Sequence, residues 1–80
     1  MKTKALKTIH RNEYDILISK LIAARKECNF TQKEVGEHLG WRQDYVSKLE
    51  AKQRRLDIIE LNDLAKIYKK DLSYFISHLM

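Results

Sequence analysis

The stretch from residue 31 to residue 50 constrains the fold of this 80-residue chain more than any other part. Thr31 and Glu34 have the spacing of a capping box, in which each side chain accepts a hydrogen bond from the other residue's backbone N–H. Gly40 follows a short helical pattern, and only glycine adopts positive φ at little steric cost. The pattern predicts two short helices, over residues 32–39 and 42–51, joined by a tight turn.

The apolar positions in this stretch support the same arrangement. They are spaced i, i+4 and i, i+3 within the two helices, so that each pair forms an inward stripe: Val35, Leu39, Val46 and Leu49. We expect Gly36 where the two helices approach closely, because a large side chain there would hold them apart. Such a pair of helices forms a helix-turn-helix, which presents its second helix to the DNA major groove.

The rest of the chain is also expected to be helical, because it has no proline, two glycines and little strand alternation. A first helix is predicted over 12–28, ended by a left-handed Asn29. A fourth helix is predicted over 58–68, capped by Asp57, with these residues on one face: Ile58, Leu61, Leu64, Ala65 and Tyr68. A short fifth helix follows from residue 71 or 72. The expected fold is all-α, a compact five-helix bundle over 12–80, preceded by a basic arm over 1–11.

The net charge of +5 is distributed unevenly. One cluster lies in the arm and contains Lys2, Lys4, Lys7 and Arg11; the other lies in and after the third helix and contains Arg42, Lys48, Lys52, Arg54 and Arg55. Basic side chains at phosphates release condensed counterions, so this clustering favours a polyanionic partner over a merely solvated surface. The arm either contacts DNA in the complex or is disordered.

Composition excludes several classes of function. A single cysteine, Cys28, cannot form an internal disulfide or a paired-cysteine metal site, and the three histidines match no ligand spacing. We therefore expect no metal and no cofactor. No apolar stretch approaches a membrane span and no signal peptide is evident, so a cytoplasmic protein is expected. No set of nucleophile, base and oxyanion donors can be assembled, so an enzyme is not expected.

Three segments carry a resemblance to a known family. They are Arg-Lys-Glu-Cys-Asn-Phe-Thr-Gln-Lys-Glu-Val-Gly at 25–36, Val-Ser-Lys-Leu-Glu at 46–50 and Arg-Arg-Leu-Asp-Ile-Ile-Glu-Leu at 54–61. From about Tyr14 to Phe75 the chain resembles the Cro and lambda-repressor-like regulators, also called the XRE family. The resemblance implies a five-helix bundle that binds double-stranded operator DNA, usually as a dimer.

The resemblance also implies roles for residues of the motif. Gln32 would hold a phosphate, steadying Gln43, and Gln43 would read a base edge. Glutamine can bond adenine, and an arginine such as Arg42 can bond guanine, in a bidentate way. The other base-reading candidates on the exposed face are Asp44, Ser47 and Lys48, and the other phosphate candidates are Tyr45, Lys52, Arg54 and Arg55. Asp44 either accepts a hydrogen bond from cytosine or caps the third helix, and Tyr45 either contacts the DNA backbone or packs in the core.

A structural ion pair between Arg25 and Glu50 is implied by the same resemblance. It would fasten the third helix to the first. The chain departs from the family pattern at three positions: Asn29, Trp41 and Arg42. These departures make the base preference of the third helix unpredictable by analogy.

The C-terminal segment is more apolar than one face of a short helix requires, which suggests an interface. The predicted dimer contacts are Tyr74, Phe75, Ile76, Leu79 and Met80; alternatively, these residues complete the monomer core. The predicted function is a sequence-specific transcriptional regulator, a dimeric repressor on a near-palindromic operator. The alternative is a protein-interaction module on the same fold, such as an antitoxin-like partner or an adaptor.

Overall fold

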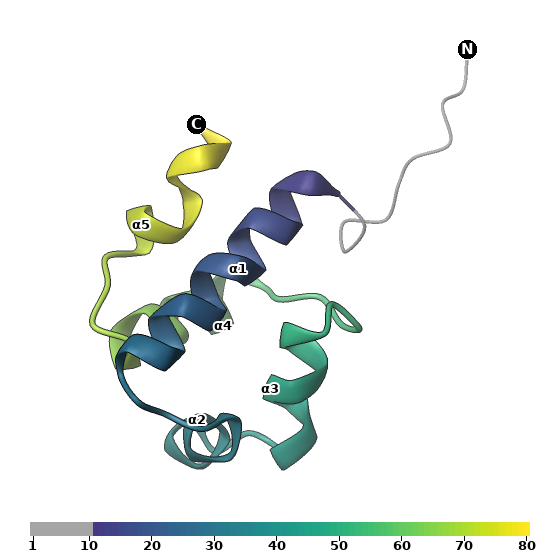
Figure 1. Cartoon of the computed structure of the whole chain (residues 1–80), viewed down its shortest axis with the longest axis vertical. Coiled ribbons are helices and arrows are strands. Elements are labelled where there is room, and N and C mark those ends of the chain that lie inside the picture. The colour runs from purple at the N-terminus through teal and green to yellow at the C-terminus, as the bar shows by residue number, and fades with distance from the viewer. Residues whose placement is uncertain (1–10) are drawn as a thin grey trace.

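The structure of the protein, a computed structural model, describes residues 11–80, and the predicted basic arm lies outside them except for Arg11. The described residues form five α-helices and a 3₁₀ helix, without strands: α1 (Asn12–Glu27), α2 (Gln32–Leu39), α3 (Gln43–Glu50), α4 (Ile58–Ile67), α5 (Leu72–Ile76) and η2 (Ser77–Leu79) (Figure 1). The all-α, five-helix prediction is confirmed. None of these helices is long and apolar enough to cross a membrane.

The predicted helix starts rest on local hydrogen bonds. Thr31 caps α2 through a capping box, in which the Glu34 backbone N–H donates to the Thr31 hydroxyl at 3.0 Å and the Thr31 N–H donates to the Glu34 carboxylate at 2.8 Å. Asp57 caps α4 in the same way with Glu60. Each cap satisfies backbone donors that the first helical turn leaves without partners.

The helix ends use left-handed residues, as predicted for Asn29 (φ 59°) and Gly40 (φ 69°). Lys52 and Lys69 adopt the same conformation after α3 and α4, with φ of 60° and 59°. The next residue then donates back into the helix: the Gln53 N–H bonds the Lys48 carbonyl and the Lys70 N–H bonds the Ala65 carbonyl. Lysine has no preference for positive φ, so these two ends carry no local sequence signal.

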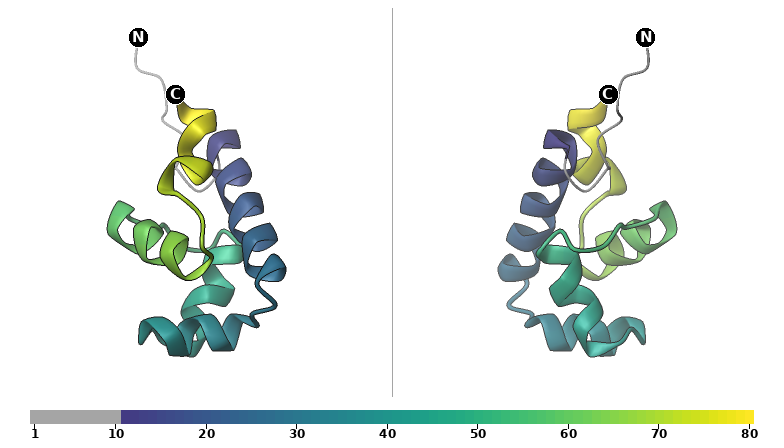
Figure 2. Two further views of the ribbon diagram at one scale, coloured as in Figure 1. Left: turned by 90° about the vertical axis from the view of Figure 1, so that its left-hand side faces the viewer. Right: turned by 90° about the vertical axis from the view of Figure 1, so that its right-hand side faces the viewer.

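The core forms around α1, which runs along one side of the molecule with α5 beside its first half (Figures 1 and 2). The C-terminal end of α3 packs against α1, while α2 lies beyond the last turn of α1. Every α-helix contributes buried side chains: Tyr14, Leu17, Ile18, Leu21, Ala24, Val35, Val46, Leu49, Leu61, Leu64, Ala65, Tyr68 and Phe75. Burial of these stripes, more than helix propensity, stabilises such short helices.

One sequence prediction about packing is wrong, and one predicted helical face is buried along only part of its length. Phe75, predicted at a dimer interface, is fully buried and completes the core. Ile58, predicted on the same face of α4 as the buried Leu61, is 55% exposed, and its neighbour Ile59 is 67% exposed. The reason is visible in Figure 2, where the N-terminal end of α4 projects away from the other helices. Ile58 is the first residue of that projecting end.

Gly36 is buried against the backbone of the turn that leads from α2 into α3. A Cβ atom added there would be 3.6 Å from the carbonyl oxygens of both Trp41 and Arg42, which is ordinary van der Waals contact. The site therefore has room for one carbon atom, while a branched side chain would meet the backbone of the turn.

Candidate nucleic-acid interface

The helix α3 has one buried and one exposed face. Val46 and Leu49 are buried on the inner face. The outer face carries Gln43, Ser47 and Lys48, which are all exposed. Arg42 precedes the helix at its N-cap, with a side chain that is 89% exposed. Local periodicity thus places the predicted base-reading residues on one outward surface, with Asp44 half-exposed among them.

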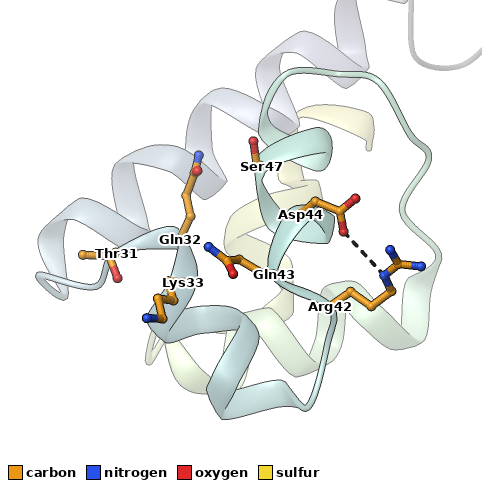
Figure 3. Close-up of a pocket in the computed structure, with 7 residues that line it drawn as sticks. All are labelled: Thr31, Gln32, Lys33, Arg42, Gln43, Asp44 and Ser47. Atoms are coloured by element: carbon orange, nitrogen blue, oxygen red, sulfur yellow. Dashed lines mark ion pairs between the residues drawn. The ribbon is translucent and has the colours of Figure 1, made fainter.

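The first turns of α2 and α3 border an open hollow of about 660 Å³, which we call the α2–α3 hollow. It is lined by Thr31, Gln32, Lys33, Arg42, Gln43, Asp44 and Ser47 (Figure 3). Gln43 points from α3 toward the start of α2, on the same side as Lys33. Helix N-termini and basic side chains both favour an anion, so this surface has the chemistry to bind a DNA backbone.

Arg25 and Glu50 form a bidentate ion pair behind this surface. The Arg25 Nε lies 2.7 Å from one Glu50 carboxylate oxygen, and its Nη2 lies 3.0 Å from the other. The two side chains are only 12% and 7% exposed. Hydrogen bonding to the Glu50 carboxylate raises the pKa of the Arg25 guanidinium, despite its partial burial. The pair joins the last turn of α3 to α1.

Gln32 extends this pair to α2. Its side-chain N–H₂ donates to Glu50 Oε1 at 2.8 Å. Arg25 also donates to the Phe30 carbonyl at 2.9 Å, which fixes the connection between α1 and α2. In this structure Gln32 therefore steadies the end of α3 through Glu50, whereas the resemblance implied that it steadies Gln43.

Asp44 does not cap α3, contrary to one of the two sequence interpretations. Arg42 occupies the N-cap, and no side chain caps the helix there. Asp44 lies in the first turn, 3.2 Å from the Lys48 ammonium one turn later and 3.7 Å from the Arg42 guanidinium (Figure 3). Its hydrogen bond with Lys48 lowers the pKa of the Asp44 carboxyl. The carboxylate thus lies between two cations of the exposed face.

Tyr45 packs against the core, as in one of the two sequence interpretations, and is partly buried there. Its hydroxyl oxygen is buried. One face of its ring stacks on Trp41 and the other is covered by the Arg54 guanidinium. Burial first, and then the Glu60 carboxylate, raise the pKa of Tyr45.

The remaining phosphate candidates occupy different environments. The Lys52 ammonium lies 2.8 Å from Asp15 of α1. Arg54 lies against Tyr45 and, through its backbone carbonyl, accepts a hydrogen bond from the Tyr14 hydroxyl at 2.8 Å. Arg55 is exposed. The loop between α3 and α4 is therefore partly packed against the rest of the fold.

Two features of this surface were not predicted from the sequence. Lys33 lines the α2–α3 hollow but was not selected as a candidate, although a cation in the first turn of α2 was visible. Trp41 and Tyr45 stack with ring centroids 4.3 Å apart. Trp41 lies in the turn before α3, so helical spacing gave no signal for that contact.

These features define a small helix-turn-helix domain of the DNA-binding class, with α3 in the position of its recognition helix. The sequence model of the helix-turn-helix family matches residues 21–75, more than half of the chain. The chain belongs to this family, in its XRE branch. It is a DNA-binding regulator of the XRE type, and this family is generally non-enzymatic.

A solved structure supports the assignment. An XRE-family like protein from Pseudomonas syringae pv. tomato str. DC3000 is 40% identical in sequence and superimposes with a TM-score of 0.80. The match covers 90% of this chain and 88% of that protein. No curated protein sequence gives a significant match to this chain.

Proposed function

We propose that the protein is a sequence-specific transcriptional regulator, a dimeric repressor that binds a near-palindromic operator through the major groove. The observation that carries this proposal is that α3 is amphipathic: its polar outer face lies opposite the buried Val46 and Leu49. A helix that is anchored on one side and polar on the other can enter the major groove without disturbing the core. The cytoplasm is the compartment in which such a regulator would meet its DNA.

Gln43 is the leading base-reading residue in this proposal. Its exposed amide can form two hydrogen bonds with adenine, and Arg42 can do the same with guanine. Lys48, Ser47 and Asp44 lie beside them on α3. One bidentate contact discriminates against the wrong base by about 1–3 kcal/mol, so its loss changes operator affinity roughly 5- to 150-fold.

Dimerisation is proposed through the C-terminal segment without Phe75. Tyr74, Leu79 and Met80 are exposed, and Ile76 is half-buried. Leu79 also borders an open hollow of about 420 Å³ whose lining includes Leu17 and Leu56. A two-fold pair would set its recognition helices about 34 Å apart, in successive major grooves. Sedimentation of a monomer at micromolar concentration, both free and on DNA, would contradict this part of the proposal.

The experiment that tests the function is selection from a randomised duplex library at about 150 mM salt. We would compare the wild type with Gln43→Ala and with Gln53→Ala, a matched control at an exposed glutamine in the loop after α3. The expected result is a two-fold-symmetric motif that Gln43→Ala relaxes at one position of each half-site and Gln53→Ala leaves unchanged. Salt-sensitive binding without an enriched motif would contradict sequence-specific reading.

A second candidate function is a protein-interaction module on the same fold. The observation that favours it is the exposure of Ile58 and Ile59 at the projecting end of α4, since large apolar side chains in solvent mark contact surfaces. Alanine at Gln32, Gln43 and Lys48 distinguishes the two functions. A DNA reader would lose its operator, whereas an interaction module would keep its protein partner.

A further inference from the structure

Tyr45 is sandwiched between two flat side chains from different segments. The Trp41 ring, in the turn before α3, lies on one face with centroids 4.3 Å apart and planes inclined by 24°. The Arg54 guanidinium, in the loop after α3, lies on the other face with its central carbon 3.4 Å from the ring centroid. A guanidinium on the face of a tyrosine is attracted by the ring quadrupole. The stack ties the loop to the recognition helix.

Further contacts limit how Arg54 can move. Its Nε donates to the Arg55 carbonyl at 3.1 Å, and its Nη2 lies 3.7 Å from the Glu60 carboxylate. Its backbone carbonyl accepts the hydrogen bond from Tyr14. The side chain nevertheless remains 38% exposed. Arg54 is therefore fixed in position and still open to solvent on one side.

Arg54 lines a third hollow, of about 200 Å³, which we call the flank hollow. It is lined by Arg42, Asp44, Tyr45, Lys48 and Arg54. Three of these side chains are cations and one is a carboxylate, so the formal charge around the hollow is +2. Each DNA phosphate carries one negative charge, and an arginine binds phosphate through its planar fork of N–H donors. The flank hollow lies beside the face of α3 that carries Lys48.

We propose that Tyr45 is a positioning residue, which holds the Arg54 guanidinium at the flank hollow so that Arg54 binds a DNA backbone phosphate beside α3. This inference rests on the proposed DNA-binding function and adds the residue that acts through Arg54. The Tyr45 hydroxyl is buried, so tyrosine contributes its ring and not a hydrogen bond to DNA. A guanidinium that is already ordered in the free protein loses less conformational freedom on binding.

The test is the salt dependence of binding to a labelled mixed-sequence duplex of about 30 base pairs, between about 50 and 200 mM salt. Each neutralised phosphate contributes about 0.9 to the slope of log K against log salt. Arg54→Gln is expected to reduce the slope by that amount. Tyr45→Leu is expected to reduce it equally although it removes no charge, and the double variant is expected to lose no more than either single variant. Tyr45→Phe keeps the flat ring and is expected to keep the wild-type slope.

The slope separates positioning from a structural role, because a merely destabilised protein melts earlier but neutralises the same number of phosphates while folded. Circular dichroism identifies the folded range of each variant, and Tyr45→Met replaces Tyr45→Leu if leucine prevents folding. A wild-type slope in the folded Tyr45→Leu variant, or in Tyr45→Met if that replaces it, overturns the positioning role and leaves the proposed function standing. Absence of salt-dependent binding by the wild type overturns both.

Discussion

Replacing Glu50 with alanine tests the ion pair that fastens the recognition helix to the rest of the fold. The substitution removes both hydrogen bonds from Arg25 and the one from Gln32. It leaves the Arg25 guanidinium, in a side chain only 12% exposed, without its counter-ion. Arg25 keeps only its bond to the Phe30 carbonyl among the contacts described above. The expected result is a less stable protein whose α3 is no longer held at its C-terminal end.

The magnitude follows from burial. Removing one partner of a buried ion pair costs about 3–5 kcal/mol because the other charge stays behind without compensation. Since both side chains retain slight solvent contact, we expect a loss near the lower limit, about 3 kcal/mol. For a domain of this size each kcal/mol shifts Tm by about 4–8 °C, so the expected decrease is roughly 12–24 °C.

The assay is thermal unfolding followed by circular dichroism, with Glu27→Ala as the matched control. Glu27 ends α1 as Glu50 ends α3, and its carboxylate lies 3.1 Å from the Lys70 ammonium. Its side chain is 59% exposed, and such a surface pair contributes less than about 1 kcal/mol. Equal decreases in Tm for the two variants would refute the reasoning. Operator binding measured well below both Tm values should weaken in Glu50→Ala alone.

Three further outcomes are expected. Gly36→Ala should fold and gain up to about 1 kcal/mol from helix propensity, since its Cβ fits 3.6 Å from the turn carbonyls, whereas Gly36→Val should lower Tm. Thr31→Ala removes the cap of α2 and should cost about 1 kcal/mol in urea unfolding, an effect that Thr31→Ser should largely avoid. Burial raises the pKa of Tyr68 above its usual 10.0, so the folded protein holds that proton more tightly than the unfolded chain. The contribution of Tyr68 to the free energy of unfolding is then fully present below about pH 10 and is lost as the pH rises above it. In urea unfolding from about pH 8 to 11.5, the free energy of unfolding should decrease less steeply with pH for Tyr68→Phe than for the wild type. Parallel curves for the two proteins would contradict this.

Local sequence patterns were sufficient to predict the structure where the stabilising interactions join residues that are close in sequence. The capping boxes at Thr31 and Asp57 involve residues three positions apart, so the starts of α2 and α4 could be predicted. Val46 and Leu49 belong to one helical stripe, and their spacing alone is enough to distinguish the inner face of α3 from the outer one. The left-handed ends at Lys52 and Lys69 could not be found in this way, because lysine gives no conformational signal there.

The sequence by itself determined an all-helical chain with a helix-turn-helix at 31–50 and a polar outer face on α3, because caps, turns and periodicity act over a few residues. Only the tertiary structure decided that Phe75 lies in the core, that Ile58 lies in solvent and that Tyr45 stacks on Arg54. Those outcomes depend on how segments distant in sequence pack against each other. Helical periodicity tells which side chains share a face, but not which neighbour, if any, will cover that face.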